Sequence, residues 1–309
     1  MLNRAWRINA PLTATGLLMA GVLAASAVGL LIDPRVITGV PIWLKPAKFA
    51  ISIGVYVATV VWVFTYLAAW TKIRAFVGWV TALTMIVEMV VILAQVSRGT
   101  SSHFNTSTAL NATLWSTMGL AILVQTIASV VLAVAIWRAR FADRAMGWAF
   151  KLGLTISILG ASSGSLMTAP TAAQLETMQA GGRPVAVGAH TVGAPDGGPG
   201  LAGTGWSTEH GDLRVPHFLG LHGFQALPLL VLAARRRAWS ERQNVRLVAA
   251  AAASYVLLFA VLLAEALRGY SIARPDGTTL VALGAWAIFS VAAGVFALAP
   301  GARDSRLAH

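Results

Sequence analysis

Apolar residues along this chain gather in long runs that are separated by charged residues, proline or glycine. A helix that crosses a bilayer needs about 20 mostly apolar residues. Eight runs reach that length, at about 11–32, 47–70, 76–97, 112–137, 146–168, 215–234, 246–267 and 279–299. The pattern therefore predicts an all-α, polytopic bundle of about eight transmembrane helices, with residues 1–309 as a single integral membrane domain.

The first run has some features of a cleavable signal peptide. Arg4 and Arg7 precede it, and residues 24–27, Ala-Ala-Ser-Ala, resemble a cleavage site. Its apolar stretch is longer than the core of a typical signal peptide. We therefore expect it to remain as the first span.

Lysine and arginine are distributed unevenly between the loops. Positive residues near span ends are retained in the cytoplasm. A cytoplasmic N-terminus places 15 of the 23 Lys and Arg residues inside, at Arg4, Arg7, Lys72, Arg74, Arg138, Arg140, Arg144, Lys151, Arg235, Arg236, Arg237, Arg242, Arg246, Arg303 and Arg306. Only three acidic residues share that side, so the whole formal net charge of +12 is cytoplasmic. We expect both termini to be cytoplasmic and the chain to lie in the plasma (inner) membrane.

Composition excludes several classes of protein. Hydrophobic residues make up 57% of the chain and charged residues 11%, whereas about 25% of residues in soluble domains are charged. The absence of cysteine excludes disulfides, thiolate metal sites and cysteine nucleophiles. A pI near 11.3 would suggest nucleic acid, but the basic residues form short clusters at span ends. We therefore expect the lipid bilayer as partner, and no nucleic acid.

The one long loop, at about 169–213, is expected on the extracytoplasmic side. It is rich in glycine, including Gly197, Gly198 and Gly200, and contains few large apolar residues. Such a composition predicts a largely irregular, mobile segment. It is either a lid over a site or an inert loop.

Histidines gather on the same side as this loop. Five of the six fall there, and only His309 is cytoplasmic. The segment 208–225 is the densest, and it contains His210, Asp212, His217, His222 and Gln225. The positive-inside rule places Lys and Arg on the cytoplasmic side. It does not explain polar residues at the outward ends of spans, so their presence there requires another explanation.

The candidate ligands for a haem or a divalent transition metal are His103, His217, His222 and Glu265. A bis-histidine haem takes one His from each of two helices at matching depth, and zinc or copper takes His and carboxylate where Cys is absent. We expect the three histidines to approach one another in the extracytoplasmic half of the bundle. In the alternative, each histidine only caps or hydrogen-bonds a loop.

Three cationic residues at outward span ends are candidates for binding a small anion. Lys45 and Lys48 open the second span, and Arg98 closes the third. Cations at a helix N-terminus oppose its dipole, so an anion beside them would be stabilising. A phosphate, a carboxylate or haem propionates would fit, and Gln225 joins these candidates because it shares a helix face with His222. Lysines that snorkel to the headgroups are the alternative.

Two residues stand out inside the spans. Glu88 lies near the middle of the third span. An acidic residue inside a membrane suggests a functional role, and the alternative is a protonated carboxyl group that makes a structural hydrogen bond. Pro228 is expected to bend the sixth span.

Several catalytic motifs fail on closer inspection. Residues 160–164, Gly-Ala-Ser-Ser-Gly, resemble a serine-hydrolase elbow but lie in a helix. Ser97 and Arg98 with His103 resemble part of a lipid-phosphatase signature that lacks its acid. The spacing of His217 and His222 is not the His-x-x-x-His of membrane zinc hydrolases.

The sequence therefore favours an outward-facing, His-rich site that binds haem or a transition metal and could serve redox chemistry. A transporter of a small anion or metal ion is one alternative. A membrane hydrolase or transferase that acts on a lipid headgroup is another. Whether the protein is an enzyme stays open.

Overall fold

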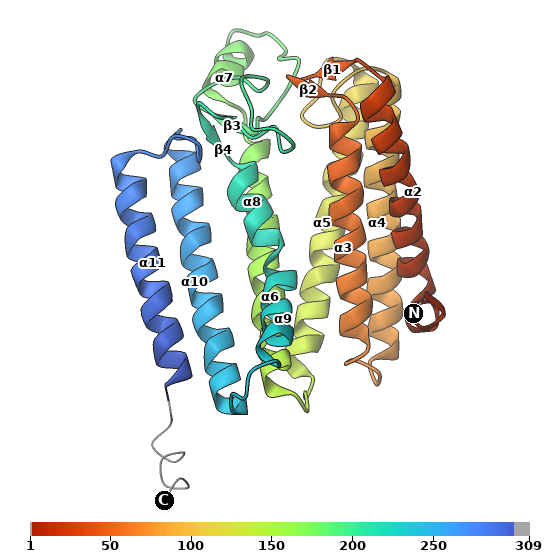
Figure 1. Ribbon diagram of the computed structural model, residues 1–309. Helices are drawn as coiled ribbons and strands as arrows, with labels where there is room; N and C mark the ends of the chain where they lie inside the picture. The colour runs from red at the N-terminus through yellow and green to blue at the C-terminus, as the bar shows by residue number, and fades with distance from the viewer. Residues whose placement is uncertain (1, 300–309) are drawn as a thin grey trace, which may run out of the picture.

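The structure is a computed structural model, and it describes residues 2–299. These residues form helices and almost no sheet (Figure 1). The helices are α1 (Leu2–Ile8), α2 (Ala10–Ile32), α3 (Leu44–Phe64), α4 (Thr71–Ser97), α5 (Ala109–Arg138), α6 (Arg144–Ser163), the 3-10 helix η1 (Gly164–Thr168), α7 (Ala172–Gln179), α8 (Arg214–Leu221), α9 (Gly223–Ala234), α10 (Glu241–Leu267) and α11 (Gly277–Leu298). Strands β1 (Val36–Ile37) and β2 (Val40–Pro41) form one hairpin, and β3 (Thr191–Val192) pairs with β4 (Gly211–Asp212).

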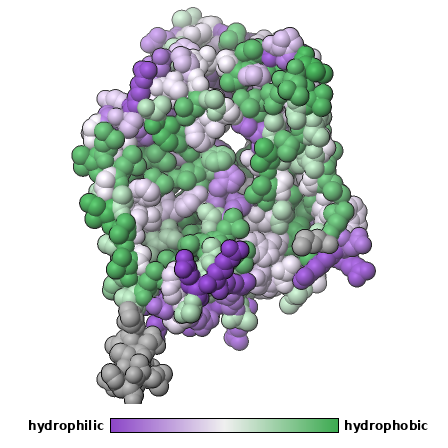
Figure 2. Space-filling view, viewed as in Figure 1, coloured by the Kyte–Doolittle hydropathy of each residue, from purple (hydrophilic) through white to green (hydrophobic). Residues whose placement is uncertain are grey.

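The prediction of a multi-pass, all-α membrane bundle is confirmed. Among the described residues, seven helices are long and apolar enough to cross a bilayer, and the bent pair α8 and α9 makes up to eight. With eight passes the two described ends of the chain lie at the same end of the bundle, as Figure 1 shows. Hydrophobic side chains cover the outer faces of the helices (Figure 2). Which end faces the cytoplasm stays a prediction.

Polar residues fix where several helices begin. Asn9, Thr108, Asp143, Ser240 and Asp276 each accept a hydrogen bond from a backbone N–H of the first turn, at α2, α5, α6, α10 and α11. Such N-caps satisfy donors that have no partner inside the helix. The apolar runs set the lengths of the spans, and these caps set their starts.

The second span ends earlier than its apolar run predicts. Helix α3 stops at Phe64, whereas the run continues to residue 70. Tight turns follow, in which Leu67 accepts a hydrogen bond from the N–H of Trp70 and its side chain is fully buried. The apolar residues after Phe64 therefore fill the core from a turn and do not extend the helix.

The sixth span is broken, but not at the predicted residue. Helices α8 and α9 meet at His222 with a bend of 47°, whereas Pro228 lies within α9. The carbonyl of Leu221 accepts a hydrogen bond from Ser157 at 2.9 Å, and the carbonyl of Leu219 accepts one from Tyr255 at 2.6 Å. Side chains on neighbouring helices thus stabilise carbonyls at the break, which a membrane interior requires.

Glycines allow this broken span to pack closely on α6. A Cβ atom on Gly153 would lie 2.7 Å from the carbonyl oxygen of Gly223, and one on Gly160 would overlap the backbone of Gly220. Small residues that let two helix backbones approach are typical of contacts between membrane helices. The glycines near His222 therefore serve helix packing.

The helices form two groups that lie side by side in Figure 1. Helices α1 to α5 pack on one another, as do α6 and α8 to α11. An aromatic cluster joins the groups in the half of the bundle near the chain ends. The ring centroid of Phe150 on α6 lies 5.1 Å from that of Trp62 on α3 and 5.4 Å from that of Tyr66 in the turn after α3. At the opposite end, residues 169–213 fold over the bundle, and we call this segment the cap.

Candidate functional site

A cavity of about 1000 Å³, which we call the chamber, lies beneath the cap between the two groups of helices. Figure 2 shows a hollow in the surface at this end. Its polar lining includes Lys45, Lys48, His103, Gln174, His190, Asp196 and Arg214, and its apolar lining includes Ile42, Phe49, Ile92, Val96, Phe104 and Leu213. The chamber thus offers charged groups and apolar walls together.

Two lysines reach the chamber because α3 begins there. Helix α3 starts at Leu44 without a side-chain cap, and Lys45 and Lys48 lie within its first five residues, near the positive end of the helix dipole. Lys48 donates a hydrogen bond of 2.6 Å to the carbonyl of Thr204 in the cap. Among the described residues, none accepts a hydrogen bond from Lys45, whose ammonium lies 5.9 Å from the ring centre of Phe49. Lys45 is therefore the cation most available to a ligand.

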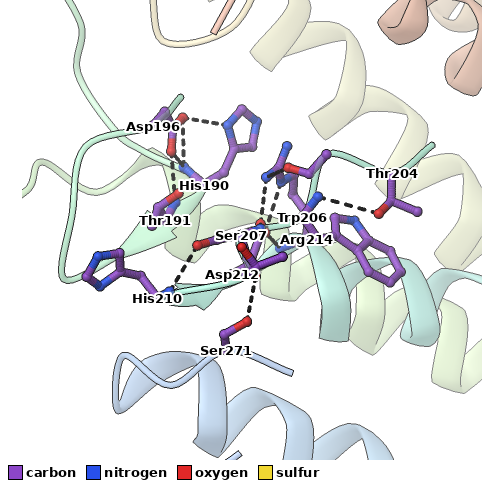
Figure 3. A network of polar contacts seen from close by, with 12 residues as sticks. His190, Thr191, Asp196, Thr204, Trp206, Ser207, His210, Asp212, Arg214 and Ser271 are labelled. Carbon is purple, nitrogen blue, oxygen red and sulfur yellow. Dashed lines mark hydrogen bonds and ion pairs between the residues drawn. The ribbon is translucent and has the colours of Figure 1, made fainter. Parts of the chain in front are cut away.

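His190 and Asp196 form a hydrogen-bonded pair within the cap. The Nδ1 atom of His190 lies 2.6 Å from Oδ2 of Asp196 (Figure 3). Asp196 also accepts hydrogen bonds from the backbone N–H groups of His190 and Thr191, at 3.0 and 2.9 Å. Burial raises the pKa of Asp196, but the hydrogen bonds from His190 and from these backbone donors lower it more, so its pKa falls well below the usual range.

The pKa of the His190 imidazole is lowered by burial, although Asp196 acts to raise it. The neutral ring is therefore favoured near pH 7. With its proton on Nδ1 facing the carboxylate, the ring presents an unprotonated Nε2. No described residue hydrogen-bonds this Nε2, so the chamber contains an oriented imidazole with a free lone pair.

His103 contacts Glu88 at the wall of the chamber. Nε2 of His103 lies 3.5 Å from Oε1 of Glu88, and the hydroxyl of Ser102 lies 3.2 Å from Nδ1. Burial holds the pKa of His103 well below 6.5, and the nearby charge of Lys45 adds to this effect. The other carboxylate oxygen of Glu88 is buried without a partner among the described residues. Both ring nitrogens of His103 are thus engaged.

Asp212 anchors the cap to the start of α8. Its carboxylate accepts hydrogen bonds from the Arg214 guanidinium at 2.6 and 2.9 Å and from the backbone N–H of Ser207 at 2.8 Å (Figure 3). Ser271 donates to the carbonyl of Ser207, and the N–H of His210 bonds the Ser207 hydroxyl. Asp212 and His210 were candidates for the site, and the structure places both in this network and outside the chamber lining.

Of the predicted site residues, the structure brings Lys45, Lys48 and His103 to the chamber. His217 lies near enough to His103 for their charges to interact, and its Nδ1 is 2.8 Å from the Gly160 carbonyl oxygen. His222 is not brought to His103, because α4 packs on α2, α3 and α5 and makes no extensive contact with α8 or α9. His309 lies outside the described residues.

Three other candidates also lie away from the chamber lining. Arg98 donates to Gln95 at 2.6 Å and to Asn111 at 2.8 Å. Gln225 donates to the Thr59 hydroxyl at 3.2 Å, where the two groups of helices meet. Glu265 is buried in α10, with Oε1 unpartnered among the described residues. Arg98 and Gln225 thus form contacts between helices.

Within residues 2–299, no group of three or more His, Asp or Glu side chains is arranged to hold a metal ion. Nε2 of His190 and Nε2 of His217 are two ring nitrogens at the chamber end that no described residue hydrogen-bonds. The haem or metal expected from the sequence stays a prediction.

The pair His190 and Asp196 was not predicted from the sequence, although the glycines near it indicate a turn. Gly193 and Gly197 adopt positive φ angles of 91° and 104°, which glycine tolerates best. Gly193 lies between the two residues and lets the chain turn back so that Asp196 reaches the backbone of His190. A His and an Asp six residues apart, with glycines between and after them, predict such a turn.

No protein-family model, curated protein or solved structure matches this chain.

Proposed function

We propose that the chamber binds a small amphipathic anion, as the binding step of a multi-pass protein of the plasma (inner) membrane. The distribution of Lys and Arg supports cytoplasmic termini. That orientation makes the cap extracytoplasmic, so the occupant would enter from outside the cell or from the outer leaflet.

The observation that carries the proposal is the charge of the chamber lining. Three lining residues are cationic, Lys45, Lys48 and Arg214, and one is acidic, Asp196. Arg214 is paired with Asp212, and Asp196 with His190. The two lysines remain without an ion pair within 4 Å among the described residues, at a helix N-terminus that also favours negative charge.

The apolar walls define the rest of the occupant. Ile92, Val96 and Phe49 line the chamber together with the lysines. Sites for small molecules combine apolar walls with a few convergent polar groups. An occupant with one anionic group and a short hydrocarbon chain satisfies both features.

Decyl phosphate tests this proposal. Its binding to the purified protein in a nonionic detergent can be measured by isothermal titration calorimetry, with decanol as the uncharged analogue. Loss of a hydrogen bond to a charged group costs about 1.5–3 kcal/mol, so Lys45→Gln should weaken binding about 10- to 150-fold. Lys72→Gln, at the exposed start of α4, is the matched control. Equal binding of decanol, or no effect of Lys45→Gln, would contradict the proposal.

Transport of the anion is a second candidate, which the broken span favours. Discontinuous helices mark substrate sites in many transporters, and α8 and α9 bend by 47° beside the place where the helix groups meet. Uptake of labelled phosphate or octanoate by proteoliposomes tests it. Accumulation that disappears in Lys45→Gln vesicles is the expected result.

A haem or transition metal in the chamber is also retained as a proposal. The feature in its favour is His190, because metal-bound imidazoles usually have the other ring nitrogen held by a carboxylate or carbonyl. Absorbance and metal analysis of protein purified without chelators decide this point. A colourless, metal-free protein that takes up neither haem nor zinc would exclude it.

A further inference from the structure

The orientation of His190 is more specific than anion binding requires. A neutral imidazole adds no positive charge to the chamber, and Asp196 already receives two backbone N–H groups that hold the cap turn. The imidazole nevertheless lines the chamber with Nε2 free among the described residues. An acceptor held in one tautomer next to cations is the arrangement that general-base catalysis needs.

We infer that His190 is the general base for hydrolysis of an anionic phosphodiester that carries an apolar chain. The inference rests on the proposed function, because the same lysines would bind the phosphate. The chamber combines a proton acceptor, two unpaired cations and apolar walls, and a phosphodiester with a hydrocarbon chain uses all three.

The step conserves atoms and charge. Water is the nucleophile, and Nε2 of His190 accepts one of its protons as the water oxygen bonds to phosphorus. The bond between phosphorus and the leaving oxygen breaks, and the electron pair stays on that oxygen. The imidazolium then donates its proton to the leaving group or to solvent, which restores the neutral ring. Lys45 and Lys48 stabilise the charge on the nonbridging oxygens.

Asp196 is a positioning residue in this scheme. It holds the tautomer that exposes the Nε2 lone pair, and its charge stabilises the imidazolium as it forms. Charged or titratable groups from four parts of the chain interact with His190. They are Asp196 of the cap, Lys45 of α3, Arg214 and His217 of α8, and His103 of the loop after α4. Asp196 is the one acidic group in this set, so its removal shifts His190 in a defined direction.

The experiment uses the full-length protein in detergent and the chromogenic probe 4-nitrophenyl decyl phosphate. The wild-type protein should release 4-nitrophenolate, and His190→Gln should lower the rate about 100- to 10 000-fold, the usual contribution of a general base. The Kd of decyl phosphate should change by no more than about threefold. Glu176→Gln, an exposed acid of the same cap, should retain the wild-type rate.

A pH profile separates positioning from a merely structural role. Asp196 acts to raise the pKa of His190, so Asp196→Asn should lower the rate and also move the acid limb of the profile to lower pH. Carbethoxylation of His190, followed by mass spectrometry, reports the same shift without relying on turnover. A lower rate with an unmoved acid limb would contradict the role of Asp196.

The two proposals fail in different ways. Binding of decyl phosphate without hydrolysis of the probe overturns the base assignment and leaves the anion site standing. Hydrolysis that His190→Gln does not slow, or faster hydrolysis of the neutral ester 4-nitrophenyl decanoate, also overturns it. If decyl phosphate does not bind, the anion site itself is wrong.

Discussion

Nδ1 of His190 lies 2.6 Å from Oδ2 of Asp196, and the same carboxylate accepts the backbone N–H of His190. One residue is thus held by one carboxylate through both its side chain and its main chain. Rotation of the ring would break a charge-assisted hydrogen bond. The imidazole therefore keeps a fixed direction in a segment that is otherwise rich in glycine.

Stability should fall as the pH is lowered from 7.5 to 5.5. Burial lowers the pKa values of His103 and His190 below 6.5 in the folded state. Below about pH 6.5 the unfolded chain binds more protons at these two residues, so the free energy of unfolding decreases as the pH falls. Above that pH the contribution is constant. Protonation of Asp196 also decreases the free energy of unfolding, but only at a lower pH, because the pKa of this carboxyl lies well below its usual range.

Thermal unfolding in detergent at several pH values checks this expectation. His103→Gln, which keeps an N–H donor for Glu88, should reduce the fall in Tm between pH 7.5 and 5.5. An identical pH dependence in the wild-type and His103→Gln proteins would contradict it.

Asp212→Asn should loosen the cap. The substitution removes the charge that holds the Arg214 guanidinium while the backbone N–H of Ser207 keeps an acceptor. A cost of about 1–3 kcal/mol corresponds to about 5- to 150-fold faster exchange of the amides it protects. Hydrogen–deuterium exchange of residues 205–213 measures this effect. Glu176→Gln should leave the exchange unchanged, and an equal effect of both variants would refute the anchor.

Gly160→Ala should destabilise the bundle, whereas Gly119→Ala should not. A Cβ atom on Gly160 would overlap the backbone of Gly220, and one on Gly119 would meet nothing within 4 Å. Overpacking costs about 1–3 kcal/mol, while glycine to alanine in an open helix position is neutral or stabilising. Urea or heat denaturation of the two variants compares them directly. Equal stability would show that α6 and α8 separate without cost.

The absence of cysteine allows a direct test of topology. Glu209→Cys places a thiol in the cap, and Glu241→Cys places one at the exposed start of α10, at the opposite end of the bundle. In intact cells a membrane-impermeant maleimide should label the first and not the second. Labelling of Glu241→Cys alone would invert the proposed orientation.

The spans were predictable because a bilayer imposes one length on every crossing helix, whatever its neighbours are. The end of α3 was not predictable, because Leu67 is an apolar residue that packs into the core from a turn and not from a helix. The break at His222 was placed at Pro228 because proline is a local signal, whereas Ser157 and Tyr255 act from other helices.

The same distinction applies to the site. Lys45, Lys48 and His103 could be found because polar residues at an apolar span end are conspicuous in one dimension. Asp196 has no such context in a polar loop, and its role depends on a turn through glycine. His222 and Glu265 looked equivalent to His103 in depth, but the sequence does not give the direction in which each helix face points.

The aromatic contacts between Trp62, Tyr66 and Phe150 have a mechanical consequence. They are among the contacts between the helix groups, and they lie at the end of the bundle away from the chamber. A helix rises about 1.5 Å per residue, so a rotation of about 5° at this cluster would displace a point about 20 residues away by about 2.6 Å. That displacement falls at the chamber. The cap contacts α3 through the hydrogen bond from Lys48 to the carbonyl of Thr204. The positive-φ glycines of the cap would allow its backbone to follow such a displacement. A change in the angle between the two helix groups at this cluster would therefore change the width of the chamber.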